Sequence, residues 1–238
     1  MLGLFLDLGS PIAAEICARA GYDWLLVDLE HGAATEADLL NLLHAIEAGG
    51  STPVVRPQSG ERLRIGRALD LGARGIMVPR LESAAEATEA VTFLRYPPTG
   101  VRGVALRVRG ADLGAIGHDD VAIINDRIVG IVQIESTGAL AQADAIAAID
   151  GVDVLFVGPA DLTHSLGIPG RFGESAYRDA LRTVVAACRA NGKAAGILVY
   201  DTAVVPDLLE LGFTFVGIGA DAAYVSAGAR TALTAVRG

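Results

Sequence analysis

The amino-acid sequence predicts a closed (β/α)₈ barrel, the TIM-barrel class of α/β fold, on three observations. Eight short apolar runs alternate with eight stretches of helical period along the 238 residues. The apolar runs are continuous, which is typical of parallel strands that are covered on both faces. Hydrophobic residues make up 52% of the chain, and no Pro-, Ser- or charge-rich linker divides it. Because barrels of this class commonly use about 200 to 250 residues as one domain, we expect a single domain over residues 1–238.

The expected strands are short and rich in Val, Ile and Leu, and they cover residues 2–6, 24–29, 53–56, 75–78, 128–134, 152–157, 194–199 and 213–218. Helical stretches follow them at 11–20, 35–48, 60–71, 83–94, 137–148, 175–190, 202–211 and 221–236. An open doubly wound sheet is the alternative fold. That fold usually carries G-x-G-x-x-G after its first strand, where this chain has Gly9-Ser10-Pro11, so the barrel is favoured.

Residues 79–127 form an unusually long connection between the fourth and fifth expected strands. Within it, Pro97-Pro98 ends a helix, and Gly100 and Gly103 allow turns. A connection of this length on the active face of a barrel is often a lid or a binding loop. A mobile surface loop is an equally good description of its second half, residues 106–120.

Charge and composition limit the partners. The formal net charge of −9 and the pI near 4.9 argue against nucleic acid as a partner. No stretch reaches the roughly 18 apolar residues of a membrane span, and the opening MLGLFLDLGS, with Asp7 in its apolar run, does not resemble a secretory signal. Cys17 and Cys188 lie far apart in expected helices, so we expect a reducing, cytoplasmic compartment.

Polar side chains follow several expected strands at the end where barrels of this class carry their chemistry. The second strand ends in Asp28, Glu30 and His31, and the third ends in Arg56. His31 is a candidate general base because imidazole titrates near neutrality, although a lone histidine is often only a hydrogen-bonded structural residue. Arg56 is suited to bind a carboxylate and to stabilise an oxyanion. An ion pair with Asp28 or Glu30 is the alternative and is compatible with that role.

Glu135 and Asp161 follow the fifth and sixth expected strands and would repel each other unless a cation neutralises them. Two carboxylates with several waters suit Mg²⁺ or Mn²⁺, and no Cys or His spacing suggests zinc. Salt bridges to Arg56 or Arg102 are the alternative. The only lysine, Lys193, opens the seventh strand at the opposite end of the barrel, which argues against a Schiff-base enzyme.

Six motifs in chain order carry a resemblance to a known family: DWLLVDLEHG, VVRP, GARGIMVPRLES, YPPTGVRG, IVQIES and GVDVLFVGPADLTHSLGIPG. Together they resemble the HpcH/HpaI family of metal-dependent aldolases over nearly the whole chain. The resemblance implies a barrel of the phosphoenolpyruvate/pyruvate type and a class II aldolase, an aldehyde-lyase. Such an enzyme makes or cleaves 4-hydroxy-2-oxo acids through an enolate held by a divalent ion. Cleavage gives an aldehyde and a 2-oxo acid, which is pyruvate or a close relative such as hydroxypyruvate.

The resemblance also implies roles for individual residues. Glu135 and Asp161 hold the ion, Mg²⁺ or Mn²⁺ with Co²⁺ as an alternative; Arg56 stabilises the enolate; and His31 transfers the proton. Asp70 matches an aspartate that pairs with this histidine, often across a subunit boundary. The resemblance also implies that the pyruvate pocket is lined by Gln133, Gly158, Pro159 and Ala160. Phe5 would stand on the aldehyde side, and Asp28 and Glu30 would orient the other groups of the site.

Assembly and acceptor are further expectations from the resemblance. Family members commonly form hexamers in which dimers exchange the last helix, and the helix at 221–236 suits burial against another subunit or against its own barrel. Arg102, Arg107 and Arg109 could attract an anionic aldehyde such as a semialdehyde, or they could pair with Asp112, Asp119 or Asp120. The competing functions are an acyl-CoA lyase of the citrate-lyase-β type, oxaloacetate decarboxylation at the same metal, and a non-catalytic 2-oxo acid sensor.

Overall fold

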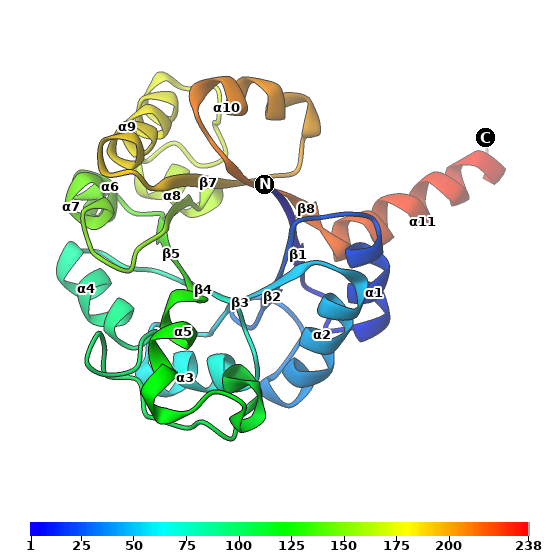
Figure 1. Ribbon diagram of the computed structural model, residues 1–238. Coiled ribbons are helices and arrows are strands. Elements are labelled where there is room, and N and C mark those ends of the chain that lie inside the picture. Colours follow the sequence, from blue (N-terminus) through cyan, green and yellow to red (C-terminus); the bar gives the residue numbers. More distant parts are fainter. Residues whose placement is uncertain (238) are drawn as a thin grey trace.

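The computed structural model describes residues 1–237, and its eight strands form a closed parallel barrel (Figure 1). The strands follow one another around the barrel in chain order, and β8 closes on β1. Their bounds are β1 Leu2–Leu6, β2 Trp24–Asp28, β3 Thr52–Arg56, β4 Gly75–Val78, β5 Val129–Ile134, β6 Val154–Val157, β7 Ala194–Val199 and β8 Phe215–Ala220. The predicted barrel is confirmed, and each expected strand lies within two residues of its observed bounds.

Helices surround the barrel (Figure 1). They are α1 Pro11–Arg19, α2 Glu36–Gly49, α3 Arg62–Asp70, α4 Ala84–Thr92, α5 Val121–Asp126, α6 Thr137–Ala141, α7 Ala143–Ala147, α8 Pro159–Ser165, α9 Ser175–Asn191, α10 Val205–Leu211 and α11 Asp221–Arg237, with 3₁₀ turns η1 Arg109–Gly114, η2 His118–Asp120 and η3 Thr202–Val204. The single helix expected at 137–148 is two helices that meet at Gln142, whose side chain accepts the N–H of Ala84.

The interior of the barrel is filled by aromatic side chains. Trp24 and Phe215 stack with their ring centroids 4.3 Å apart, and Phe5 and Phe156 pack edge-on or tilted around them. Gly3 is needed beside Trp24, because a Cβ there would lie 2.1 Å from the indole ring. Since the interior is packed, a ligand must bind at one end of the barrel. We call the end at which the strands finish the C-terminal face, and the opposite end the N-terminal face.

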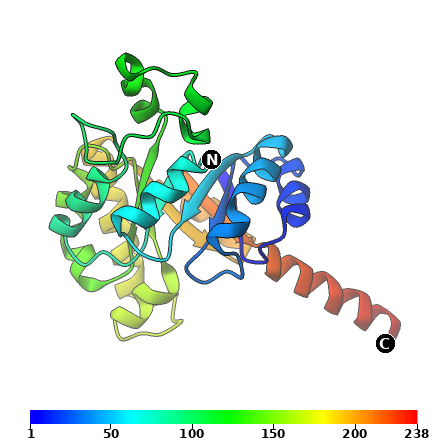
Figure 2. The same cartoon turned by 90° about the horizontal axis from the view of Figure 1, so that it is seen from below.

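The long connection does not lie on the C-terminal face, so the expectation of a lid there is wrong. It follows α4 and leads into β5, and therefore residues 93–127 lie at the N-terminal face. Figure 2 shows them, in green, at the end of the barrel opposite α8. They are also packed rather than a bare loop: Tyr96, Ala111 and Ile124 form a small core of their own. Asn125 exchanges two hydrogen bonds with the main chain of Tyr96.

The last helix, α11, leaves the barrel and projects away from it in both views (Figures 1 and 2). Among its residues only Asp221 is buried, and Val225, Leu233 and Val236 are exposed, Val236 to 87%. The alternative in which this helix packs on its own barrel is therefore wrong. Within residues 1–237, no helix has the length and apolar character needed to cross a membrane.

Candidate active site

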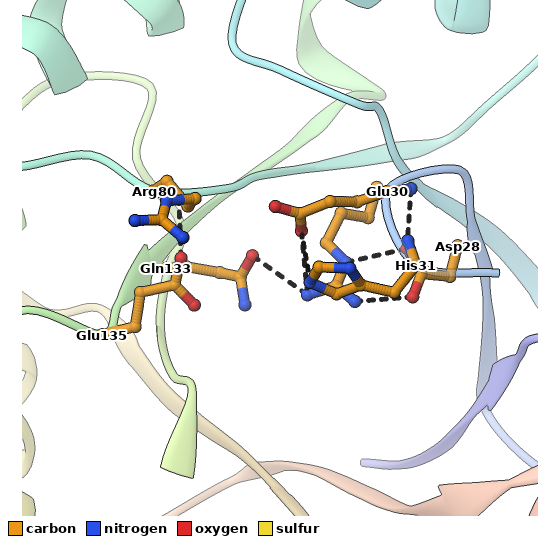
Figure 3. A network of polar contacts seen from close by, with 7 residues as sticks. Asp28, Glu30, His31, Arg80, Gln133 and Glu135 are labelled. Carbon is orange, nitrogen blue, oxygen red and sulfur yellow. Dashed lines mark hydrogen bonds and ion pairs between the residues drawn. The ribbon is translucent and has the colours of Figure 1, made fainter. Parts of the chain in front are cut away.

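Asp28 and Arg56 form the centre of a polar network on the C-terminal face. Figure 3 shows this network with Asp28, Glu30 and His31 labelled on one side and Gln133 and Glu135 on the other. They end neighbouring strands and lie directly opposite each other in the parallel register of β2 and β3. Arg56 Nε donates to Asp28 Oδ1 at 3.0 Å and Nη2 donates to Oδ2 at 2.5 Å, and both side chains are buried. The same Oδ1 accepts the main-chain N–H groups of Glu30 and His31 at 3.0 and 3.2 Å. Asp28 thus fixes both the guanidinium and the turn that carries the histidine.

The outer edge of the Arg56 guanidinium faces the rest of the site. Nη1 lies 3.2 Å from Glu30 Oε2 and donates to Gln133 Oε1 at 3.5 Å. The Phe5 ring lies 5.5 Å from Cζ and separates the arginine from the barrel interior. Burial disfavours the charge on Arg56, but the hydrogen bond and charge of Asp28, together with the charges of Glu30 and Glu135, outweigh it and raise the pKa. The ion pair that the sequence offered as an alternative therefore exists, and it leaves one guanidinium nitrogen beside Gln133.

His31 projects from this network into solvent. Its side chain is 66% exposed, and Nε2 lies 3.7 Å from Glu30 Oε2. Gly32 makes the turn possible, because a Cβ at that position would lie 2.4 Å from the Asp28 carbonyl oxygen. Burial raises the pKa of Glu30, while the charges on Arg56 and His31 oppose the rise. His31 is thus held through its main chain while its ring remains free to meet a substrate.

Glu135 follows β5 and is 7% exposed. Its Oε1 accepts the N–H of Arg80 at 2.8 Å, a contact made possible by a left-handed residue at position 80, with φ of 50°. Its other oxygen, Oε2, faces the space left by Gly158, where a Cβ would lie 2.6 Å away. Burial raises the pKa of Glu135, the Arg80 N–H opposes this, and the charge of Asp161 adds to it.

Asp161 lies in the first turn of α8 and is exposed. Neither Asp161 nor Glu135 forms an ion pair with any residue in 1–237, so the salt-bridge alternative offered by the sequence is not realised there. No cluster of three or more His, Cys, Asp or Glu suited to a metal ion occurs in that range. The carboxylates of Glu135 and Asp161 still fit Mg²⁺ or Mn²⁺, because Glu135 Oε2 faces the space beside Gly158. Such an ion keeps several of its coordination positions for water and substrate.

The main chain at 158–160 offers less than the sequence suggested. The Gly158 N–H donates to the Ile134 carbonyl at 3.3 Å, and Pro159 has no N–H. Among Gly158, Pro159 and Ala160, which were expected to bind an anionic oxygen, only Ala160 therefore has a main-chain N–H available for it. Gly158 instead leaves the space beside Glu135.

Asp70 and His31 do not meet within one chain. Asp70 ends α3 near the N-terminal face, where its Oδ1 accepts from Arg102 Nη2 at 2.8 Å. Arg102 is 2% exposed and stacks on Tyr96, with its Cζ 4.3 Å from the ring centroid. The arginines that could attract an anionic aldehyde also lie at the N-terminal face. Arg109 pairs with Glu47 and donates to the Leu71 carbonyl. The partners expected from the sequence were instead Asp112, Asp119 or Asp120.

Two further polar residues stand on the C-terminal face and were not assigned from the sequence. Asp7 follows β1, and Tyr200 follows β7. Each could have been found by the rule that selected Asp28 and Glu135, because a polar residue directly after an apolar strand of a barrel points to the C-terminal face.

The fold and the site define an enzyme of the (β/α)₈ class with arginine, histidine and carboxylates at its C-terminal face. Residues 1–227 match the family model described as HpcH/HpaI aldolase/citrate lyase. The chain belongs to this family, and it is a carbon–carbon lyase of the aldolase type.

Individual relatives agree with this assignment. The chain is 43% identical to the 2-keto-3-deoxy-L-rhamnonate aldolase of Klebsiella pneumoniae over 92% of its own length and 82% of that relative. It is 44% identical to the hydroxypyruvate/pyruvate aldolase of Paraburkholderia phytofirmans, over 100% of its length and 93% of the relative. The crystal structure of an HpcH/HpaI aldolase/citrate lyase family protein from Burkholderia cenocepacia matches with a TM-score of 0.94 at 41% identity, covering 100% of this chain and 95% of that one.

Proposed function

We propose that the protein is a divalent-metal-dependent aldolase that makes or cleaves 4-hydroxy-2-oxo acids. The pieces are pyruvate, or a close 2-oxo acid such as hydroxypyruvate, and an aldehyde. The observation that carries the proposal is the Arg56 guanidinium, which Asp28 holds rigidly beside Gln133 on the face that also carries Glu135 and His31. The names of the two aldolase relatives support the same substrates.

Glu135 and Asp161 would hold the ion, Mg²⁺ or Mn²⁺ with Co²⁺ as an alternative. When bound, the ion supplies a Lewis acid beside the 2-oxo acid. Arg56 then stabilises the negative charge that grows on the keto oxygen as a methyl proton leaves, and it does so without reorganisation because Asp28 already fixes it. Gln133 and the Ala160 amide complete the 2-oxo acid pocket, and the Phe5 ring lies beneath Arg56.

His31 moves the proton. In the direction of synthesis, Nε2 accepts a proton from the carbon next to the keto group, and that carbon then bonds to the aldehyde carbon. The aldehyde oxygen becomes an alkoxide and takes up the proton that His31 Nε2 accepted, which gives the 4-hydroxyl group and restores neutral His31; cleavage runs the same steps backwards. Asp70 of a second subunit would pair with His31 in this scheme. Lys193 precedes β7 at the N-terminal face, so it does not reach the substrate for a Schiff base.

Proton exchange on pyruvate tests the proposal. The protein is incubated with pyruvate in D₂O with Mg²⁺ or Mn²⁺, and the methyl signal is followed by proton NMR. We expect the signal to disappear with metal, to persist with a chelator, and to persist in the Glu135→Gln variant. Absence of exchange with any divalent ion would reject the aldolase mechanism and favour a 2-oxo acid sensor.

Assembly and compartment follow from features outside the site. We infer a homo-oligomer, a hexamer by family resemblance, in which the exposed apolar side chains of α11 pack against another copy. We also infer a cytoplasmic location, because Cys17 and Cys188 are both free and no disulfide contributes to the barrel.

A further inference from the structure

Asp7 stands directly above the barrel interior on the C-terminal face. Phe5 belongs to the interior aromatic cluster, whereas Leu4 and Leu6 belong to the outer core between strands and helices. Side chains alternate along a strand, so Asp7 continues the inward-facing row one layer above Phe5. Electrostatic coupling of Asp7 to Asp28, Arg56 and His31 agrees with this position.

The main chain at Asp7 is fixed from three sides. Its N–H donates to the buried carboxylate of Asp221 at 2.8 Å, and its carbonyl oxygen accepts the N–H of Ala33 at 2.7 Å. The loop that carries His31 packs on it, because a Cβ at Gly32 would lie 3.3 Å from the Asp7 Cα. The side-chain carboxylate itself makes no hydrogen bond or ion pair within residues 1–237. A rigidly placed carboxylate with unused acceptor oxygens therefore faces the site.

Tyr200 lies on the same side of the opening. Gly196 and Leu198 border the barrel interior, so Tyr200 continues the inward row of β7, and it is 64% exposed. Burial raises the pKa of Tyr200, and the charges of Asp7, Arg56 and Asp28 also affect it, which agrees with a position on this face. The strands β7, β8 and β1 thus present a carboxylate and a phenol at the opening. Asp7 follows β1, which lies across the barrel from β5 and Glu135, whereas Tyr200 follows β7, which only β6 separates from β5 (Figure 1).

We propose that Asp7 determines which aldehyde is accepted: it receives a hydrogen bond from a hydroxyl group of a neutral hydroxyaldehyde and repels an aldehyde that carries a carboxylate. This inference rests on the proposed function and adds the chemical class of the second substrate. The 2-oxo acid occupies the side of Arg56, Gln133 and Glu135, so the aldehyde must approach from the side that Asp7 and Tyr200 border. Within one chain the arginines that could have attracted an anion are at the N-terminal face, and Arg102, which would reach this face of a second subunit together with Asp70, is already paired with that carboxylate.

Competition between two acceptors measures this directly. The ratio of kcat/KM for glyceraldehyde to that for succinic semialdehyde is determined at pH 8 and fixed pyruvate and metal. Because both reactions use the same enolate, the ratio cancels any effect of a variant on pyruvate activation. Asp7→Asn and Asp7→Ser both remove the charge, so the test can still be made if one of these variants does not fold. Asp179→Asn is the matched control, since it removes an exposed carboxylate from α9.

We expect the ratio to fall at least fivefold in the Asp7 variants relative to Asp179→Asn, through a gain on the semialdehyde. A smaller change in the folded variants overturns the role of Asp7. Pyruvate proton exchange in the unmodified protein distinguishes failure of the acceptor role of Asp7 from failure of the proposed function. Exchange with an unchanged ratio rejects only the acceptor role, whereas absence of exchange rejects the proposed function and this inference with it.

Discussion

The carboxylate of Asp28 holds Arg56 through two parallel hydrogen bonds of 3.0 and 2.5 Å, and one of its oxygens also receives the N–H of His31. A single side chain therefore orients the group that stabilises charge and the group that moves the proton. Its position follows from the barrel itself, because Asp28 and Arg56 are register partners at the ends of β2 and β3.

Replacing Asp28 by Asn removes the closer counter-charge of the buried guanidinium and leaves it only Glu30. Breaking a buried ion pair from one side costs about 3 to 5 kcal/mol of unfolding free energy, and a displaced Arg56 should lower kcat about 100-fold. Denaturant unfolding and pyruvate exchange measure the two effects. Asp179→Asn breaks the exposed Asp179–Arg182 pair and should cost less than about 1 kcal/mol. Equal costs in the two variants would contradict the central role of Asp28.

Gly158 has a testable relation to the proposed metal ligand. A Cβ at position 158 would lie 2.6 Å from Glu135 Oε2, so Gly158→Ala must displace the carboxylate. We expect Mn²⁺ affinity, measured by calorimetry or electron paramagnetic resonance, to fall at least about tenfold, in line with changes to groups that orient metal ligands. Gly173→Ala meets no atom within 4 Å and serves as the control. Unchanged affinity in Gly158→Ala would show that Glu135 Oε2 does not bind the ion.

Mixed oligomers test whether Asp70 serves His31 of another chain. We expect His31→Asn and Asp70→Asn proteins each to be nearly inactive, and co-expressed mixtures to regain activity, since about a quarter of sites then combine two unaltered residues in a symmetric assembly. Pyruvate exchange of the purified mixture is the readout. No recovery would mean that Asp70 acts only within its own chain, as the partner of Arg102.

Asp7 should make stability depend on pH in the metal-free protein. Burial, together with the charges of Asp28 and Asp221, raises the pKa of Asp7 from 3.8 to about 6. The folded state thus favours the protonated form, and this stabilisation is complete below pH 3.8 and is lost as the pH rises through 6. Asp7→Asn should therefore raise Tm at pH 7.5, by a stabilisation on the order of 1 kcal/mol after allowance for solvent screening. Near pH 4.5 the difference in Tm should be small. An equal difference at both pH values would refute the assignment.

The exposed side chains of α11 predict an effect on assembly. Leu233 and Val236 together place two large apolar groups in solvent, and burying each contributes about 1.5 to 3 kcal/mol. The double variant Leu233→Asp/Val236→Asp should reduce the molar mass found by light scattering. Leu209→Asp changes an equally exposed leucine on α10 and should leave the mass unchanged. If the mass is the same in both variants, α11 does not join subunits.

The strands and most of the site could be predicted from the sequence because both depend on local patterns. Continuous apolar runs locate strands, and the barrel topology brings their ends together, so Asp28, Arg56 and Glu135 could be grouped without knowing any distance. The long connection was misplaced because spacing alone does not tell on which side of a helix extra residues lie. Here α4 follows β4 at once, and the extra length comes after it.

Other features depend on contacts that sequence patterns do not contain. The break at Gln142 reflects a bond to Ala84, which is remote in the chain. The direction of α11 is not decided by its composition, because an Ala- and Val-rich helix suits either its own barrel or another. Asp7 differs in kind: in the sequence it interrupts an N-terminal apolar run, and only the alternation from Phe5 in the folded strand places it on the inner row.

The single lysine of the chain has a practical consequence. Lys193 immediately precedes β7 at the N-terminal face, and the amino group of Met1 donates to the Thr214 carbonyl at that same end. These two amines thus lie at the end of the barrel opposite the catalytic opening. Coupling to a solid support through these amines would attach each barrel at the end opposite its own Arg56 and Glu135, away from the side chains that the proposed reaction needs.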